Sequence, residues 1–594
     1  MTEGGDVKTL ETPVLVVGGG PVGLSTALHL AHCGIESVIV ERHRSTSIHP
    51  KASYFNIRTM EILGQLGVAD ELYATALLGA GVSFYTKLAG HRLGGLSGAD
   101  FPDYVASVFA STPRPGCISS QIVLEAILKR HAEENPLIHV LFNHEKTALE
   151  QSESSVRTTI LDRASGESMI IESDYVIACD GVHSATRDEL GAAMVGPPPF
   201  GHMINIYFEA DIESLVTDCD QALYWIASPE APGVFISLGR DRQKWCFNTQ
   251  YFPEHGEQPE DYTEARCTEK LHAAFGTREL PVKILAIGPW VLCGQVVDDY
   301  RVGRVFFGGD TAHLNIPTGG FGFNTGMQET HNLAWKIAAV LGGWAPDAIL
   351  DSYHQERRPI AKFNVEASRE NAMRIRETGA ALGDTAPDVE EVDLDTPVGL
   401  EQRARLSAAI ANQRSHFLFL GQEIGFDYSN SSIVVADGTP HYVEEHGVED
   451  PIFTYLPNAR PGARAPHCWL TNPAEGGAQS SILTLFDKEL VLLVAGDPGE
   501  WLRTLDAGVS DIPLRAVGIG SPESDLEYHD KDGVFHDHYG IGQGGAVLVR
   551  PDGHVAWRTP TDPEHHTGIS LSDALEIATA RREPIRSTSQ EDAK

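Results

Sequence analysis

The sequence predicts an α/β protein with several domains, and three observations support this prediction. An apolar run at 14–17 leads into a glycine-rich turn and a helical segment, which is how a strand–helix–strand unit begins. Residues 190–290 contain short alternating apolar runs instead, which are typical of β-strands. Beyond about residue 400 a new set of strand-like segments begins. A chain of 594 residues is too long for one hydrophobic core, which agrees with this division.

The N-terminal unit carries the complete pattern of a dinucleotide-binding site. Gly18, Gly20 and Gly23 have the G-x-G-x-x-G spacing, a helical segment follows, and a second apolar strand ends at Glu41. The first glycine permits a tight turn, the second lets a pyrophosphate approach the backbone, and the third lets helix and strand pack closely. Residues 540–545 repeat the spacing but precede a strand-like run, so we interpret them as a loop.

Composition and charge exclude several kinds of partner. The net charge of −37 disfavours binding to nucleic acid and to anionic membranes. No apolar run approaches the length of a membrane span, and residues 1–13 lack the apolar core of a signal peptide. The eight cysteines are scattered without C-x-x-C, so neither a metal site nor a disulfide framework is expected. We interpret them as reduced thiols of a cytoplasmic protein.

The elements that follow the glycine turn are predicted in order along the chain. Helices are expected over 56–72 and 120–133, and alternation over 139–171 favours a hairpin or meander. A short apolar strand over 175–179 ends at Asp180. The β-rich segment then has strand candidates at 204–210, 223–227, 234–238 and 244–249.

Aromatic residues are dense in the β-rich segment. Tyr224 and Trp225 are candidates to cover a flat apolar ligand, and the alternative is that these rings simply fill a core.

A second glycine-rich loop follows a strand at 304–307 that ends in Gly308, Gly309 and Asp310. The loop runs from Pro317 to Asn324 and feeds a helix that ends near residue 342. The spacing of Thr325 and Gln328 resembles a capping box and predicts that the helix starts there. The N-terminus of such a helix suits a ring carbonyl or a developing negative charge.

Three stretches in this order, VVGGGPVG, ACDGVHSATR and FFGGDTAHLNIPTGGFGFNTG, resemble the signature motifs of single-component FAD-dependent aromatic hydroxylases. This is the group of para-hydroxybenzoate hydroxylase and phenol hydroxylase. The resemblance covers roughly residues 13–360. It implies FAD as the cofactor and NADH or NADPH as a transient co-substrate.

The resemblance also implies which residues contact the cofactor and the substrate. Glu41 and Arg42 should lie at the adenosine end, Gln121 at the flavin side chain or pyrophosphate, and Asp310 at the ribityl chain. The remaining cofactor residues implied are Gly18, Gly20, Gly23, Asp180, Gly309, Gly322, Phe323 and Asn324, and the substrate residues are Tyr224, Trp225, Pro317 and Phe321.

The sequence departs from the family pattern at several positions. Lys51 stands where many relatives have arginine, and Phe321 stands where many have a polar residue. Ser53 stands near the position of an acidic residue that activates the phenol in phenol hydroxylases, so no catalytic base is assigned. We interpret His313 as a structural hydrogen-bonding residue.

The chemistry implied by the resemblance is hydroxylation of a phenolic ring. Reduced nicotinamide delivers a hydride to FAD, reduced flavin captures dioxygen as a hydroperoxide, and one oxygen atom passes to the ring. Two alternatives stay open. The same scaffold could tailor an aromatic polyketide by hydroxylation or by Baeyer–Villiger-type oxygenation, or the chain could bind flavin without turnover.

The C-terminal third resembles the thioredoxin-like domain of the phenol hydroxylase branch. Strands are expected at 481–486, 489–494 and 546–558, the last with a turn at 550–553. Only Cys468 is available there, so we expect no thiol redox activity and a structural role, covering the enzyme or joining it into a homo-oligomer. The expected parts are 1–189 and 291–395 for the FAD-binding domain and its linker, 190–290 for the substrate domain and 396–594 for the C-terminal domain.

Overall fold

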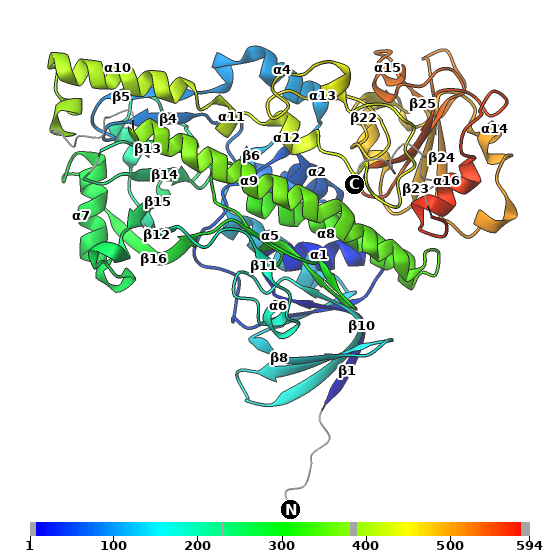
Figure 1. Ribbon diagram of the computed structural model, residues 1–594, viewed down its shortest axis with the longest axis horizontal. Helices are drawn as coiled ribbons and strands as arrows, with labels where there is room; N and C mark the ends of the chain where they lie inside the picture. The colour runs from blue at the N-terminus through cyan, green and yellow to red at the C-terminus, as the bar shows by residue number, and fades with distance from the viewer. Residues whose placement is uncertain (1–7, 229, 381–388, 584–594) are drawn as a thin grey trace, which may run out of the picture.

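The computed structural model describes residues 8–228, 230–380 and 389–583 (Figure 1). Three large sheets organise these residues. In Figure 1 the C-terminal sheet lies at one end of the molecule, an inserted sheet lies at the other, and the N-terminal sheet with its helices lies between and below them. The predicted α/β architecture is confirmed.

The N-terminal sheet is largely parallel and has the central order β18-β19-β10-β1-β2-β7. Its strands are β1 (Thr9–Val17), β2 (Ser37–Glu41), β7 (Ile138–Phe142), β10 (Ser168–Ala178), β18 (Arg301–Val302) and β19 (Val305–Phe307). Strands β8 (His144–Gln151) and β9 (Val156–Asp162) extend it as an antiparallel meander from β10. The carboxyl ends of β1, β2, β10 and β19 therefore share one edge of the sheet, where ligands bind in open α/β sheets.

Four helices build the core around this sheet. They are α1 (Pro21–His32), α5 (Gln121–Glu134), α8 (Phe321–Leu341) and α9 (Ser352–Ala380). The predicted helix over 56–72 is in fact two, α2 (Ile57–Gln65) and α3 (Ala69–Thr75). The break lies at Gly67, whose φ of 73° is left-handed and ends the first helix.

The inserted sheet has the order β16-β12-β15-β14-β13-β4-β5. Its strands are β12 (Gly201–Glu209), β13 (Leu223–Ile226), β14 (Gly233–Ser237), β15 (Lys244–Tyr251), β16 (Lys283–Leu292), β4 (Val82–Tyr85) and β5 (Arg92–Leu96). The strand predictions for 190–290 are confirmed. The structure also draws 82–96 from the first part of the chain into this sheet, because β4 pairs with β13.

The C-terminal sheet has the order β22-β21-β25-β24-β23-β26-β27. Its strands are β21 (Trp469–Thr471), β22 (Gln479–Ser481), β23 (Leu490–Val494), β24 (Leu514–Gly520), β25 (Tyr528–His529), β26 (Ala546–Val549) and β27 (Val555–Thr559), and α16 (Leu571–Ala578) packs beside β27. The predicted hairpin over 546–558 is confirmed, whereas 482–485 forms a short 3-10 helix rather than a strand.

The first part of the segment between α9 and the C-terminal sheet packs on the inserted sheet at the other end of the molecule. Helix α10 (Pro397–Ala411) packs on β5 of the inserted sheet, with Leu406 and Ile410 in a core shared with Phe84. Residues 397–411 therefore pack with the inserted sheet rather than with the C-terminal sheet.

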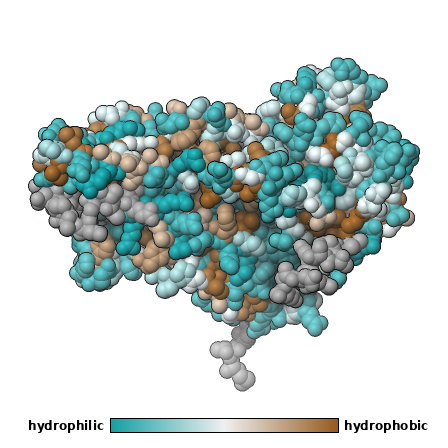
Figure 2. Space-filling view, turned by 45° about the horizontal axis from the view of Figure 1, so that its top comes forward, coloured by the Kyte–Doolittle hydropathy of each residue, from teal (hydrophilic) through white to brown (hydrophobic). Residues whose placement is uncertain are grey.

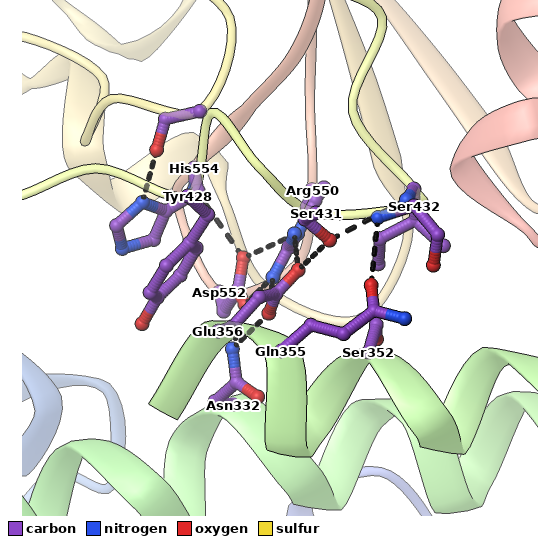
Figure 3. Close-up of polar contacts among 12 residues, drawn as sticks. Asn332, Ser352, Gln355, Glu356, Tyr428, Ser431, Ser432, Arg550, Asp552 and His554 are labelled. Carbon is purple, nitrogen blue, oxygen red and sulfur yellow. Dashed lines mark hydrogen bonds and ion pairs between the residues drawn. The ribbon is translucent and has the colours of Figure 1, made fainter. Parts of the chain in front are cut away.

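A buried set of charges joins the C-terminal domain to α8 and α9 (Figure 3). Arg550, which follows β26, donates to both oxygens of Glu356 on α9 at 2.6 and 2.9 Å. Lys336 on α8 donates to the same carboxylate at 2.7 Å, and Arg550 also pairs with Asp552. Burial opposes ionisation of Glu356, but the Arg550 and Lys336 cations lower its pKa to about 2. This network is charged, fully buried and closely partnered.

The surface agrees with a strongly acidic chain. Figure 2 shows a face on which hydrophilic residues predominate and hydrophobic residues form small separate groups. None of the helices within the described ranges combines the length and apolar character that a membrane crossing requires. The structure has all eight cysteines as free thiols.

Candidate active site

The glycine turn after β1 has the geometry that a pyrophosphate site needs. Gly18 has a φ of 111°, and a Cβ there would lie 2.2 Å from the Cys179 oxygen. A Cβ on Gly23 would lie 1.9 Å from the Gly18 oxygen, so both positions require glycine. Gly20 differs, because a Cβ there would have no protein atom within 4 Å among the described residues. Gly20 is also the N-cap of α1. Because glycine has no side chain to cap the helix, the backbone N–H groups of the first turn of α1 face open space.

The acidic residue at the end of β2 is fixed beside this turn. Glu41 accepts a hydrogen bond from the Gly19 N–H at 2.8 Å and another from the His43 N–H at 2.8 Å. Arg42 beside it is exposed. This placement suits an adenosine ribose next to a pyrophosphate.

Asp180 and Asp310 follow the parallel strands β10 and β19, but their surroundings differ. Asp180 accepts hydrogen bonds from Ser184, Thr186 and Thr311, so it holds α6 (Ala185–Glu189) and the end of β19 together. Asp310 is exposed at the same sheet edge. Gly309 has a φ of 60° and its N–H donates to Glu329 at 2.9 Å.

Helix α8 begins at Phe321, four residues before the predicted start at Thr325. Gly320 is the N-cap with a φ of 68° and no side-chain cap. Thr325 donates to the Phe321 oxygen within the helix, so the capping-box interpretation is wrong. The glycine loop therefore delivers the uncapped end of α8 directly after Gly319 and Gly320.

Side chains in the first turn of α8 hold the loop before α2. The Asn324 amide accepts from the Asn56 N–H at 3.0 Å and donates to the Tyr54 oxygen at 3.0 Å. Phe321 is buried against Phe419, and Phe323 meets Phe55 edge-on at 5.3 Å. Gly322 lies in the same turn, whereas Pro317 is exposed at the start of the loop.

The two glycine-rich segments converge although about 290 residues of sequence separate them. Helices α1 and α8 pack together, and a Cβ on Gly326 would lie 2.8 Å from Val22 and 3.1 Å from the Gly309 Cα. Gln121 stands beside them and accepts from the Ala52 N–H at 3.0 Å, which fixes the 47–56 loop. An extended dinucleotide such as FAD fits this arrangement, which combines the backbone N–H groups and open space at Gly20 with the uncapped N-terminus of α8.

No sequence pattern indicated a buried acid that the structure places beside the start of α2. Glu423 on α12 (Leu420–Ile424) accepts from the Tyr54 hydroxyl at 2.5 Å and from the Ile57 N–H at 3.2 Å. Burial raises the pKa of Glu423 to about 7, although the two hydrogen bonds oppose that rise. No local pattern marks this residue, because its partners lie more than 360 residues away in the sequence.

His313 has the structural role that we expected. It is fully buried, with Nδ1 3.0 Å from Asn315 Oδ1 and Nε2 3.2 Å from Glu329 Oε2. Burial alone would lower its pKa, but the Glu329 carboxylate raises it above the ordinary value.

The two neighbouring aromatic residues on β13 point to opposite faces of the inserted sheet. Tyr224 is fully buried among Trp245 and other core rings, and its hydroxyl donates to Glu213 at 3.0 Å. Trp225 stacks on Phe84 at 6.1 Å on the other face. Tyr224 and Trp225, which were both predicted to contact the substrate, therefore cannot line the same surface.

Comparisons with known proteins agree with this geometry. A family model described as an FAD binding domain matches residues 11–368, and one described as an aromatic-ring hydroxylase C-terminal domain matches residues 458–580. The chain is 32% identical to the tetracenomycin A2 monooxygenase-dioxygenase of Streptomyces glaucescens over 97% of this chain and 98% of that protein.

Two solved structures share the whole architecture. The flavin-dependent monooxygenase PieE, in complex with FAD and substrate, aligns with a TM-score of 0.87 and 32% identity, covering 96% of this chain and 99% of that one. The ternary complex of aklavinone-11 hydroxylase with FAD and aklavinone aligns at 30% identity with the same coverage and a TM-score of 0.77.

Proposed function

We propose that this chain, which belongs to the FAD-dependent aromatic-ring hydroxylases, hydroxylates a phenolic compound with a fused polycyclic ring system, using NADH or NADPH and dioxygen. The observation that carries the proposal is the convergence of the Gly18–Gly23 turn and the α8 terminus at one sheet edge, beside the inserted sheet. The relatives named above, which act on tetracenomycin A2 and aklavinone, support a polycyclic substrate of the polyketide type.

The chain's own residues would bind and shield the cofactor. FAD supplies dioxygen activation and transfer of one oxygen atom when it is bound. The backbone N–H groups at Gly20 would hold the pyrophosphate, Glu41 the ribose and Asp310 the ribityl chain. The uncapped N-terminus of α8 would stabilise negative charge on the pyrimidine side of the flavin ring.

The apolar side chains around the loop would exclude water from the reaction. Phe321 and Phe419 are buried in contact, and Tyr54 packs on both Phe419 and the Gly320 turn. A dry site protects the reactive oxygen species from water and aligns the ring that receives the oxygen atom.

Turnover of defined probes tests this function. The FAD-loaded protein is incubated with NADH or NADPH and with 1,8-dihydroxyanthraquinone, and nicotinamide oxidation and product mass are followed. The expected result is oxidation stimulated by the probe and a product heavier by one oxygen atom. Tight FAD binding without product, across a panel of phenols and hydroxylated polycyclic quinones, would contradict the proposal and favour a non-catalytic flavin protein.

A further inference from the structure

One face of the inserted sheet carries a row of side chains that lie directly opposite one another on neighbouring strands. Asn205 on β12 is paired in register with Gly288 on β16 and with Asn248 on β15. Asn248 is paired with Val234 on β14, which is paired with Trp225 on β13. Directly opposed residues share a face, so these side chains form one continuous strip across five strands.

Three polar atoms of this strip are buried without hydrogen-bond partners among the described residues. Asn205 is 7% exposed and Asn248 is 8% exposed. Within the described part of the chain, the side-chain oxygens of both residues and the indole N–H of Trp225 have no hydrogen-bond partner. The Asn205 amide nitrogen donates to the Pro50 oxygen at 3.1 Å, which fixes the orientation of that amide. The Asn205 side chain also makes a hydrogen bond with the Cys246 thiol, which is only a weak partner.

Two histidines extend the strip at its ends. The His49 ring covers Gly288, since a Cβ there would lie 3.0 Å from His49 Nε2, and neither ring nitrogen has a partner among the residues that the structure describes. Burial and the nearby Lys51 cation lower the pKa of His49, so the ring is neutral near pH 7. At the other end, the rings of His416 and Trp225 lie 6.3 Å apart.

The opposite face of the same strands is an ordinary core. Ile206, Phe247, Phe235 and Tyr224 stand next in sequence to the strip residues and belong to one buried cluster. The unpartnered groups of these strands are therefore confined to one face, the one that contacts Pro50 in the 47–56 loop. A buried polar group without a partner is costly, and such a concentration indicates groups that await a ligand.

We propose that Asn205, Asn248 and Trp225 recognise the oxygen substituents of a fused polycyclic aromatic substrate lying along this strip. The two amide oxygens accept hydrogen bonds from ring hydroxyls, and the indole N–H donates to a quinone-type carbonyl. Three strand spacings separate β12 from β13, which is about 14 Å and exceeds the span of a single phenol ring. The proposal deepens the proposed function, because it assigns substrate selection at the same site to named residues.

Binding of two matched probes tests the proposal. The full-length FAD-loaded protein is titrated with 1,8-dihydroxyanthraquinone and with unsubstituted anthraquinone, and each dissociation constant is measured by equilibrium dialysis. The wild-type protein is expected to prefer the dihydroxy probe by at least about tenfold. Asn205→Leu and Asn248→Leu should each reduce that preference by about tenfold, while the affinity for anthraquinone stays equal or rises.

The control is Phe247→Leu, which alters the other face at the position next to Asn248. It should lower stability and leave the preference between probes unchanged. A wild-type protein without preference, or an Asn248→Leu variant that keeps it, overturns the inference. Turnover is measured separately, so a wild-type protein that prefers the dihydroxy probe but forms product from no member of the panel refutes the proposed function and leaves this inference intact.

Discussion

Two sets of buried polar side chains in this protein differ in how completely they are partnered. At the contact between the C-terminal domain and α8–α9, Glu356 accepts hydrogen bonds from Arg550, Lys336 and Asn332, and Ser431 adds another. Along the strip on the inserted sheet, the amide oxygens of Asn205 and Asn248 lack partners within the described ranges. Complete partnering indicates a structural contact, whereas its absence in an otherwise packed sheet indicates a ligand surface.

Breaking the partnered network should have the largest effect on stability. Arg550→Met leaves the buried Glu356 and Asp552 carboxylates without their main cation, and we expect a loss of about 3–5 kcal/mol in the free energy of unfolding. Urea denaturation of the full-length FAD-loaded protein at pH 7 measures it. Arg515→Met, which removes an exposed pair with Glu527, is the control and should cost at most about 1 kcal/mol. Equal losses in the two variants would show that the network does not hold the domains together.

Glu423 is partnered less completely than Glu356 but more completely than the strip residues, because two hydrogen-bond donors and no cation contact its buried carboxyl group. Its folded pKa of about 7 exceeds the ordinary value of 4.5, so the folded state favours the protonated form. The stabilisation that Glu423 gives to the folded state is fully present below about pH 4.5. As the pH rises to about 7, the free energy of unfolding loses this contribution of roughly 3 kcal/mol.

The free energy of unfolding should therefore fall more steeply from pH 5 to pH 8 in the wild-type protein than in Glu423→Gln. Other titrating groups are common to both proteins and cancel in the difference. Parallel curves would mean that Glu423 is already ionised in the folded protein at pH 5.

Asp310 tests the cofactor site, where its carboxylate is exposed at the sheet edge. Asp310→Ala should weaken FAD binding by about 1.5–3 kcal/mol, because a ribityl hydroxyl would lose a charged acceptor. Flavin fluorescence during reconstitution of the apoprotein gives the dissociation constant. Asp525→Ala, at an exposed carboxylate in the C-terminal domain, should leave that constant unchanged. Equal FAD affinity in both variants would contradict the placement of the ribityl chain.

The smallest expected effect concerns Asn248, and it separates a ligand-binding role from a structural role for the strip. Asn248→Leu should change the free energy of unfolding by no more than about 0.5 kcal/mol, because the amide oxygen makes no hydrogen bond that leucine would remove. Asn364 is a matched buried asparagine whose amide bonds to both Thr325 and Gln422. Asn364→Leu should cost about 1–3 kcal/mol by thermal or urea denaturation. A large loss in Asn248→Leu would assign that residue a structural role.

Local patterns determined much of the architecture before any tertiary contact was known. The glycine spacing at 18–23 requires a particular backbone, and the structure confirms steric demands at Gly18 and Gly23 that only glycine meets. Alternation predicted the strands of the inserted sheet, and the turn at 550–553 predicted the C-terminal hairpin. These features depend on residues within a few positions of each other, so the sequence alone expresses them.

Tertiary structure decided what depends on the pairing of distant segments. Helix α8 starts at Phe321, and the Asn324 amide in its first turn bridges to Tyr54 and Asn56, which are far away in the sequence. The register of β12, β15 and β13 places Trp225 on the strip and Tyr224 in the core. Glu423 acquires its raised pKa only when α12 is buried against residues 54–57. Burial, register and partnering are properties of the folded chain, because each arises from contacts between residues that the sequence keeps far apart.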